Sequence, residues 1–272
     1  MTRREVVLLS GLLALLGAGW GITQPLAKIA VSTGYQHFGL VFWQMAIGAA
    51  LMALICRLRS IRLPLTRRHL QFYVTIALIG TILPSTASYQ AAVHLPSGIL
   101  SILLSMVPIF AFPVALALGL DRFSLRRCLG LLAGFAGVLL IVAPGLALPR
   151  DVAAFWVFVG LISGFFYAIE GNVVAKWGTL GLNAFQVLYG ASLVGTVIMA
   201  PVAWLSGQWI DPRPPLDGPQ LALVAASIAH VLVYAGYVWL VGRAGPVFAV
   251  QVSYLVTGFG IFWAKLILNE AY

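Results

Sequence analysis

The chain has 272 residues, of which 61% are hydrophobic and 8% are charged, and its formal net charge is +9. The mean hydropathy is +1.01. These values lie far from the usage of water-soluble globular domains and exclude that class of fold. Apolar segments of about 20 residues have the length that a helix needs to cross the roughly 30 Å hydrocarbon core of a bilayer. The alternating pattern of a membrane β-barrel is absent, so the composition predicts an all-α membrane protein.

The hydropathy pattern predicts nine membrane-spanning helices joined by short loops. In chain order they cover residues 6–29, 38–56, 70–92, 96–120, 125–143, 152–175, 182–205, 221–241 and 246–268. Since no loop between them is long enough to hold a soluble domain, we expect one transmembrane domain. The predicted fold class is therefore a polytopic membrane helical bundle.

Arginine residues gather on alternate loops of the first half. They precede the first predicted helix, follow the second, and lie between the fourth and the fifth: Arg3, Arg4, Arg57, Arg59, Arg62, Arg67, Arg68, Arg122, Arg126 and Arg127. The opposite loops carry only Lys28 and Arg150. Basic residues near membrane spans mark the cytoplasmic side. The pattern therefore predicts a cytoplasmic N-terminus, and we interpret the net positive charge as a topology signal rather than a nucleic-acid site.

The second part of the chain follows the first at an offset of 148 residues. At this offset Gln24 aligns with Asn172 and Tyr89 aligns with Tyr237, and the spans and loops stay in phase. Equivalent helices are five spans apart, an odd number, so the second copy enters the membrane from the opposite side. We predict two inverted repeats, residues 1–148 with five helices and residues 149–272 with four.

Three segments resemble one family of transporters. They are residues 89–108, YQAAVHLPSGILSILLSMVP, residues 119–124, GLDRFS, and residues 129–140, LGLLAGFAGVLL. They look like the helix 3 to helix 5 region of the EamA-type drug/metabolite transporters. Within that superfamily the chain is most similar to the bacterial aromatic amino-acid exporters of the YddG kind. The resemblance implies export across the bacterial inner membrane by ten helices, arranged as five plus five with both termini cytoplasmic.

The chain departs from the family pattern in two places. It stops at Tyr272, where a tenth helix should begin, so we expect the natural protein to carry one more apolar span. Where the family usually has a Gly-Glu pair after the fourth helix, this chain has Gly119, Leu120 and Asp121. Any role of that glutamate is therefore not carried over to this sequence.

Polar side chains inside the predicted spans are candidates for a substrate pathway, because such groups face a bundle interior or a cavity. Several repeat at helical spacing and include a tyrosine or tryptophan, which suits a ligand with an apolar body and polar ends. The candidate substrate-binding residues are Trp20, Gln24, Gln44, Ser85, Tyr89, Ser105, Tyr167, Glu170, Tyr234, Tyr237, Gln251 and Tyr254. The candidate hinges are Gly21, Pro25, Pro84, Pro108 and Gly258. A break at Pro25 would expose backbone groups that can hold charged substrate ends.

Each of these features has a structural alternative. Serines at four-residue spacing often only allow close helix packing, and His230 can be a hydrogen-bonded packing residue. Glu170 is the acidic residue well inside a span, where it would couple protons or contact a substrate amine, or else pair with Lys176. Glu270, near the outer end of the last span, can extend toward the membrane surface.

These features predict a secondary transporter that exports small amphipathic metabolites, aromatic and other amino acids first among them, by alternating access. The alternatives are another substrate class, such as nucleosides, sugars or toxic compounds, and a multi-spanning membrane enzyme. Clustered acid, base or metal-binding side chains are missing from the sequence, and so is a Walker A motif, which argues against an enzyme and against direct ATP use. We expect no cofactor, no metal, lipid as the surrounding partner, and a monomer ahead of an oligomer.

Overall fold

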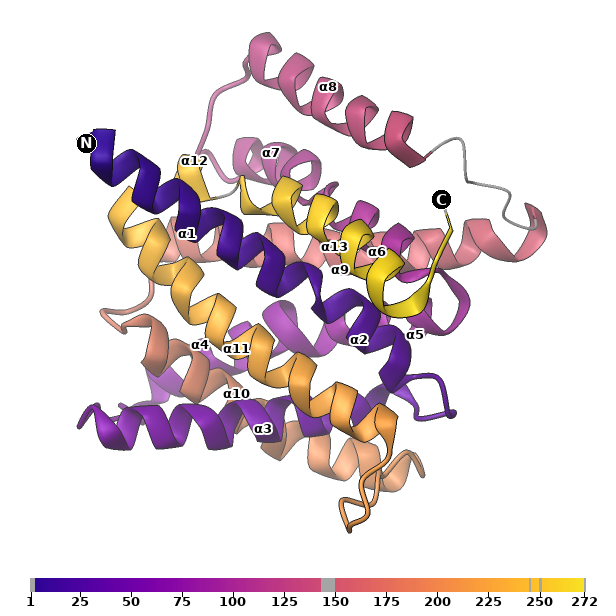
Figure 1. Ribbon diagram of the computed structural model, residues 1–272. Helices are drawn as coiled ribbons and strands as arrows, with labels where there is room; N and C mark the ends of the chain where they lie inside the picture. The colour runs from indigo at the N-terminus through magenta and orange to yellow at the C-terminus, as the bar shows by residue number, and fades with distance from the viewer. Residues whose placement is uncertain (1–2, 143–149, 245, 250, 272) are drawn as a thin grey trace.

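The computed structural model describes residues 3–142, 150–244, 246–249 and 251–271, and within these ranges the chain forms helices and no strands (Figure 1). The elements are α1 (Arg3–Gly21), α2 (Thr23–Ala30), α3 (His37–Leu58), α4 (Arg67–Ala77), the π-helix η1 (Leu78–Ile82), α5 (Leu83–His94), α6 (Ser97–Leu104), α7 (Val107–Ala117), α8 (Leu125–Val142), α9 (Arg150–Trp177), α10 (Ala184–Leu205), α11 (Gly218–Ala244), α12 (Pro246–Ala249) and α13 (Val252–Leu268).

The predicted helical bundle is confirmed, with each predicted span matched by one helix or by consecutive helices. Within the described residues, seven helical stretches are long and apolar enough to cross a membrane, and α13 is a shorter apolar helix: Arg3–Ala30, His37–Leu58, Arg67–His94, Ser97–Ala117, Ala154–Trp177, Ala184–Leu205, Gly218–Leu240, and Val252–Leu268 for α13. The predicted fifth span corresponds to α8, although its last residue, Ala143, lies outside the described residues. The expected repeat boundary between residues 148 and 149 also lies outside them.

The first span is divided into α1 and α2 at Ile22, three residues before Pro25. Ile22 keeps right-handed helical dihedral angles, φ −66° and ψ −23°, and its N–H donates to the Ala18 carbonyl over 3.1 Å. The Thr23 hydroxyl donates to the Trp20 carbonyl over 2.6 Å. The expected exposure of backbone groups is therefore not found at this junction, because helical bonds and one side chain occupy them.

Prolines mark the interruptions in the third and fourth spans. Pro84 follows η1 and occupies the first turn of α5. Proline has no N–H to donate to the preceding turn, which explains why the helix widens into a π-helix just before it. Pro108 stands in the first turn of α7, after the break at Ser105 and Met106. Gly258, in contrast, lies inside the continuous helix α13, and the ninth span is interrupted instead between α12 and α13.

The two halves pack against each other symmetrically. Helix α3 packs on α10, its counterpart, and α6 packs on α13. The contact of α1 with α13 is matched by that of α9 with α7, and the contact of α2 with α11 is matched by that of α9 with α5. The α4 contact with α10 likewise has its counterpart in the α11 contact with α3. This exchange symmetry is what a two-repeat bundle produces.

Small residues allow α1 and α13 to cross at close range. Gly21 lies against the backbone of Gly260, where a methyl group at position 21 would come within 2.8 Å of the Gly260 nitrogen. The indole N–H of Trp263 donates to the Ala18 carbonyl over 3.1 Å, which ties the same two helices together. In contrast, α8 lies apart from the rest of the bundle beside α7 (Figure 1). Close packing through glycine is a common means of helix association in membranes.

Glu270 binds the N-terminal end of α6. Its carboxylate accepts hydrogen bonds from the Ser97 N–H over 2.9 Å, the Ser97 hydroxyl over 3.0 Å and the Gly98 N–H over 3.1 Å. A carboxylate at this position satisfies free helix N–H groups and interacts favourably with the helix dipole. The side chain is therefore not simply extended toward the membrane surface, because it joins the end of α13 to the start of α6.

Replacing Glu270 with Ala should destabilise the protein by about 1–2 kcal/mol, the usual effect of losing a helix cap. Glu270→Gln retains one acceptor oxygen, so its loss of stability should be smaller than that of Glu270→Ala. Thermal unfolding of the purified protein in detergent measures both. Equal unfolding temperatures for the wild type and Glu270→Ala would show that the cap contributes nothing.

Candidate functional site

Five helices surround a polar cavity in the interior of the bundle. Its lining comes from α2, α3, α5, α9 and α11, and consists of Thr23, Gln24, Ala27, Gln44, Ser85, Ser88, Tyr89, Tyr167, Ala226 and His230. The Tyr89 hydroxyl donates to the Gln44 side-chain oxygen over 3.1 Å, which links α5 to α3 across the lining. Hydroxyl and amide groups inside a membrane protein are costly unless they serve packing or a ligand. Their convergence here identifies the candidate site.

Aromatic rings form a cluster next to this cavity. The Trp20 ring lies 5.2 Å from that of Tyr237, 6.3 Å from that of Tyr234 and 6.3 Å from that of His230, measured between centroids. The Trp20 and Tyr234 rings meet edge to face, with an interplanar angle of 78°. This cluster joins α1 to α11. Tilted and edge-to-face rings present both π faces and polar tips to an amphipathic ligand.

Glu170 supplies a carboxylate beside the aromatic cluster. Its side chain is 8% exposed and accepts a hydrogen bond from the Tyr234 hydroxyl over 3.1 Å. The π-helix places Gly80 directly against this carboxylate, and any side chain at position 80 would collide with it. The irregular third span thus makes room for the acid.

The pairing of Glu170 with Lys176 is not found. The Lys176 ammonium instead donates to the Leu118 carbonyl over 2.8 Å, at the end of α7. The hydrogen bond between Glu170 and Tyr234 joins α9 to α11. A buried carboxylate with one hydroxyl partner keeps acceptor capacity for a further donor.

The cavity is small in this conformation, about 50 Å³. A water molecule needs roughly 10–15 Å³ by the same kind of measure, whereas pockets for metabolites usually enclose about 300–1,000 Å³. The cavity therefore has room for a few water molecules. Binding of a bulky metabolite requires the surrounding helices to move apart.

Most candidate residues from the sequence come together around this site. Trp20, Gln24, Gln44, Ser85, Tyr89, Tyr167, Glu170, Tyr234 and Tyr237 line the cavity or belong to the adjoining cluster. His230, considered above as a packing residue, lines the cavity and also belongs to the aromatic cluster. Thr23, Ala27 and Ala226 also line the cavity and carried no distinct signal, because small residues beside polar ones are common in membrane helices.

Three candidates lie elsewhere. The Ser105 hydroxyl is buried and donates to the Ile102 carbonyl in its own turn over 2.7 Å, the packing role weighed for the serines of this span. Gln251 is exposed, next to the start of α13. Tyr254 is 37% exposed and borders a shallow apolar groove on α13, away from the polar cavity. Their spacing along the helices placed them among the polar candidates, but the rotation of each helix directs these side chains away from the cavity.

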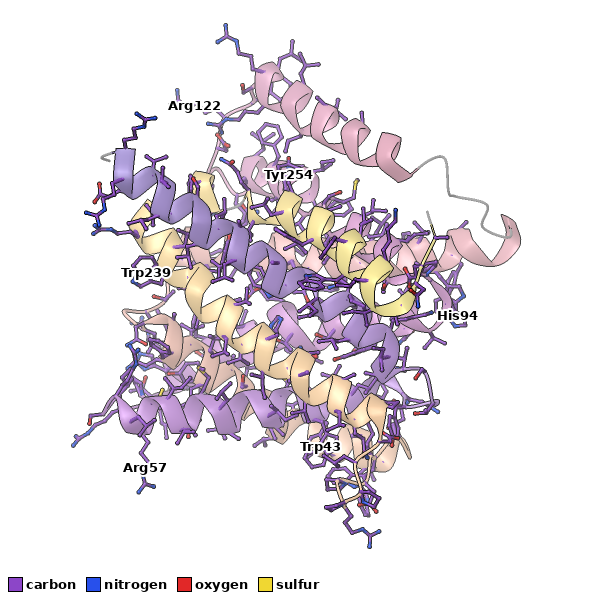
Figure 2. All side chains as sticks on the ribbon, viewed as in Figure 1. Trp43, Arg57, His94, Arg122, Trp239 and Tyr254 are labelled. Atoms are coloured by element: carbon purple, nitrogen blue, oxygen red, sulfur yellow. The ribbon has the colours of Figure 1, made fainter. Side chains whose placement is uncertain are left out.

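The arginine-rich loops lie at one end of the bundle. Figure 2 shows Arg57 and Arg122 at the end where the N-terminus lies, with His94 toward the opposite end. The site residues lie between these ends, since Trp20 lies next to the junction of α1 and α2, inside the first span, and Glu170 lies inside α9. Such a central location is typical of transporter binding sites.

The model of the EamA-like transporter family matches residues 8–143 and 154–272, nearly the whole chain. The chain belongs to the EamA-like transporter family. It is thus a multi-pass membrane transporter, and its two matched segments agree with the symmetric packing of the halves.

Two relatives of this EamA-like chain share about a quarter of its residues. The "Uncharacterized inner membrane transporter YedA" of Escherichia coli strain K12 is 24% identical over 261 residues, covering 94% of this chain and 81% of the relative. The same-named protein of Escherichia coli O157:H7 gives the same values. One protein of known crystal structure superposes with a TM-score of 0.56 at 17% identity, over 99% of this chain and 100% of that one. At this identity the superposition supports the fold alone.

Proposed function

We propose that this protein exports small amphipathic metabolites that carry an amine, a class that includes the aromatic amino acids, across the bacterial inner membrane. The observation that carries the proposal is the Glu170 carboxylate, buried beside the rings of Trp20, Tyr234 and Tyr237. A carboxylate attracts an ammonium group, and the rings accommodate an apolar body. The inner-membrane location follows the name of its relative in Escherichia coli.

The proposed transport cycle is alternating access between two repeats, residues 1–148 and 149–272, with the N-terminus in the cytoplasm. Interrupted helices in the first, third, fourth and ninth spans support it, since each break supplies a place to bend. Gly21, Pro84 and Pro108 adjoin such breaks, whereas Pro25 and Gly258 lie within helices. The small cavity represents a closed stage in this cycle.

A second candidate is a carrier of neutral polar solutes such as sugars or nucleosides. The observation in its favour is the cavity lining, which is rich in uncharged hydroxyl and amide groups such as Gln24, Ser85 and Tyr89. Hydroxyl-rich substrates find matching donors and acceptors in such a lining. This candidate leaves Glu170 without a ligand partner, so we favour the amine carrier.

Counterflow in proteoliposomes tests the proposal. Purified protein is reconstituted into liposomes. The proteoliposomes are loaded with one unlabelled compound from a panel of amino acids, nucleosides and sugars, and a labelled trace of the same compound is added outside. We expect transient accumulation of the label with amine compounds. Accumulation with sugars or nucleosides and none with amines would refute the proposed substrate class.

A further inference from the structure

The charges around the cavity are one-sided. Glu170 supplies a carboxylate to the aromatic cluster that adjoins the cavity, whereas neither that cluster nor the cavity lining contains a lysine or arginine among the described residues. Resting on the proposed function, we propose that, within the amine class, the preferred substrates are cationic amines with an aromatic or apolar body and no free carboxylate, so that amines, esters and amides bind better than the corresponding zwitterionic amino acids.

The negative side of the site is built to receive a cation. Glu170 is held in place by the Tyr234 hydroxyl and by the close approach of Gly80, and the Trp20 ring lies against Tyr234. An ammonium group that reaches the carboxylate would lie among ring faces that also attract cations. Carboxylate and π systems thus act on the same end of the ligand.

Among the described residues, no cationic side chain of the cavity lining balances the Glu170 carboxylate. Lys28 lies one turn beyond Gln24, but its ammonium donates to the carbonyls of Ala92 and Val93 over 2.7 and 3.2 Å. Lys176 is bound to the Leu118 carbonyl. The helix junction at Ile22 keeps its helical hydrogen bonds, so it does not present an unwound backbone to an anion. Within the described residues, a substrate carboxylate in the cavity would therefore meet only neutral donors.

This asymmetry sets the preference between substrates. A carboxylate that leaves water loses its hydration and regains it only through a cationic partner or several donors. An amine without that group avoids the cost and keeps the attraction to Glu170. The difference predicts at least about tenfold tighter binding of the amine, which corresponds to about 1.4 kcal/mol.

Titration calorimetry of the full chain in detergent tests this inference with matched ligands. Phenethylamine, phenylalanine methyl ester, phenylalaninamide and phenylalanine share the ring and the amine and differ in the carboxyl group. The titrations with phenethylamine and phenylalanine are run near pH 8, where an ordinary histidine is neutral, so that His230 carries no compensating charge. Phenylalaninamide and the methyl ester are titrated near pH 6, where their amines are cationic, with phenylalanine repeated there as the reference.

Two charge-gain variants, Gln24→Lys and Gln44→Lys, each place an ammonium in the lining. We expect these variants to narrow or reverse the ratio of phenethylamine affinity to phenylalanine affinity, because they improve phenylalanine binding and weaken phenethylamine binding. A general loss of folding would weaken every ligand alike, so the reversal separates the two cases. The ligand series on the wild-type protein stands even if neither variant folds.

Phenethylamine binding at least about tenfold tighter than phenylalanine binding supports the inference. Equal or tighter phenylalanine binding, together with amino-acid counterflow, would overturn the inference and leave the proposed function intact. Phenethylamine binding at least about tenfold tighter than phenylalanine binding, without counterflow of any amine, would overturn the proposed function and leave the inferred binding preference intact. Binding of neither ligand, with counterflow of sugars, would overturn both.

Discussion

Substituting Gln for Glu170 is expected to reduce counterflow of amine substrates at least about tenfold while leaving the fold intact. The glutamine side chain keeps the shape of the glutamate and can still accept a hydrogen bond from the Tyr234 hydroxyl, now 3.1 Å from the carboxylate. Only the negative charge is lost, and a hydrogen bond to a charged group contributes roughly 1.5–3 kcal/mol. The measurement is the initial rate of labelled substrate accumulation in proteoliposomes that hold equal amounts of protein.

Glu5→Gln is the matched control. Glu5 pairs with Arg243 over 3.2 Å on the exposed surface, so the control removes a carboxylate far from the cavity. Its counterflow should equal that of the wild type. If Glu170→Gln also transports at the wild-type rate with the same pH dependence, Glu170 has no part in binding or coupling, and the proposed function loses the observation that carries it.

Gly21→Ala should destabilise the bundle by about 1–3 kcal/mol, the usual cost of overpacking, and should slow transport as well. A methyl group at this position would lie 2.8 Å from the Gly260 nitrogen and 3.0 Å from the Phe259 carbonyl carbon. Both are backbone atoms and cannot rotate away, so α1 and α13 must separate. The higher helix propensity of alanine offsets only about 0.5–1 kcal/mol of this cost.

Gly11→Ala is the control in the same helix. A methyl group at position 11 would meet no atom within 4 Å, so this variant should be as stable as the wild type or slightly more stable. Thermal unfolding in detergent, followed by counterflow on the folded fraction, measures both variants. Equal melting temperatures for Gly21→Ala and Gly11→Ala would show that the close approach of α1 and α13 is not required.

The site was predictable to the extent that helical spacing determines which residues share a face. Trp20 and Gln24 are four residues apart, as are His230 and Tyr234, and both pairs face the interior. The same spacing failed for Gln251 and Tyr254, which are exposed. A stripe fixes neighbours along one helix but not the direction in which that helix turns its stripe.

The role of Glu270 could not be obtained from the sequence either. As a charged residue near the end of a span it fits extension toward water, yet it binds the Ser97 and Gly98 backbone more than 170 positions away in the chain. The π-helix at Leu78–Ile82 was likewise not predicted, although Pro84 indicated a kink. Contacts between distant segments decide both features.

The sequence by itself determined the membrane class and the positions of the spans, because apolar length and hydrogen-bond satisfaction inside a bilayer leave few alternatives. The transporter family was indicated separately, by the resemblance of three segments to known members. Only the tertiary structure decided that Glu170 meets Tyr234 and Gly80, and that the nearby lysines are held at backbone carbonyls. Side-chain partners depend on how helices rotate and cross. Local spacing does not contain that information, whereas packing between helices does.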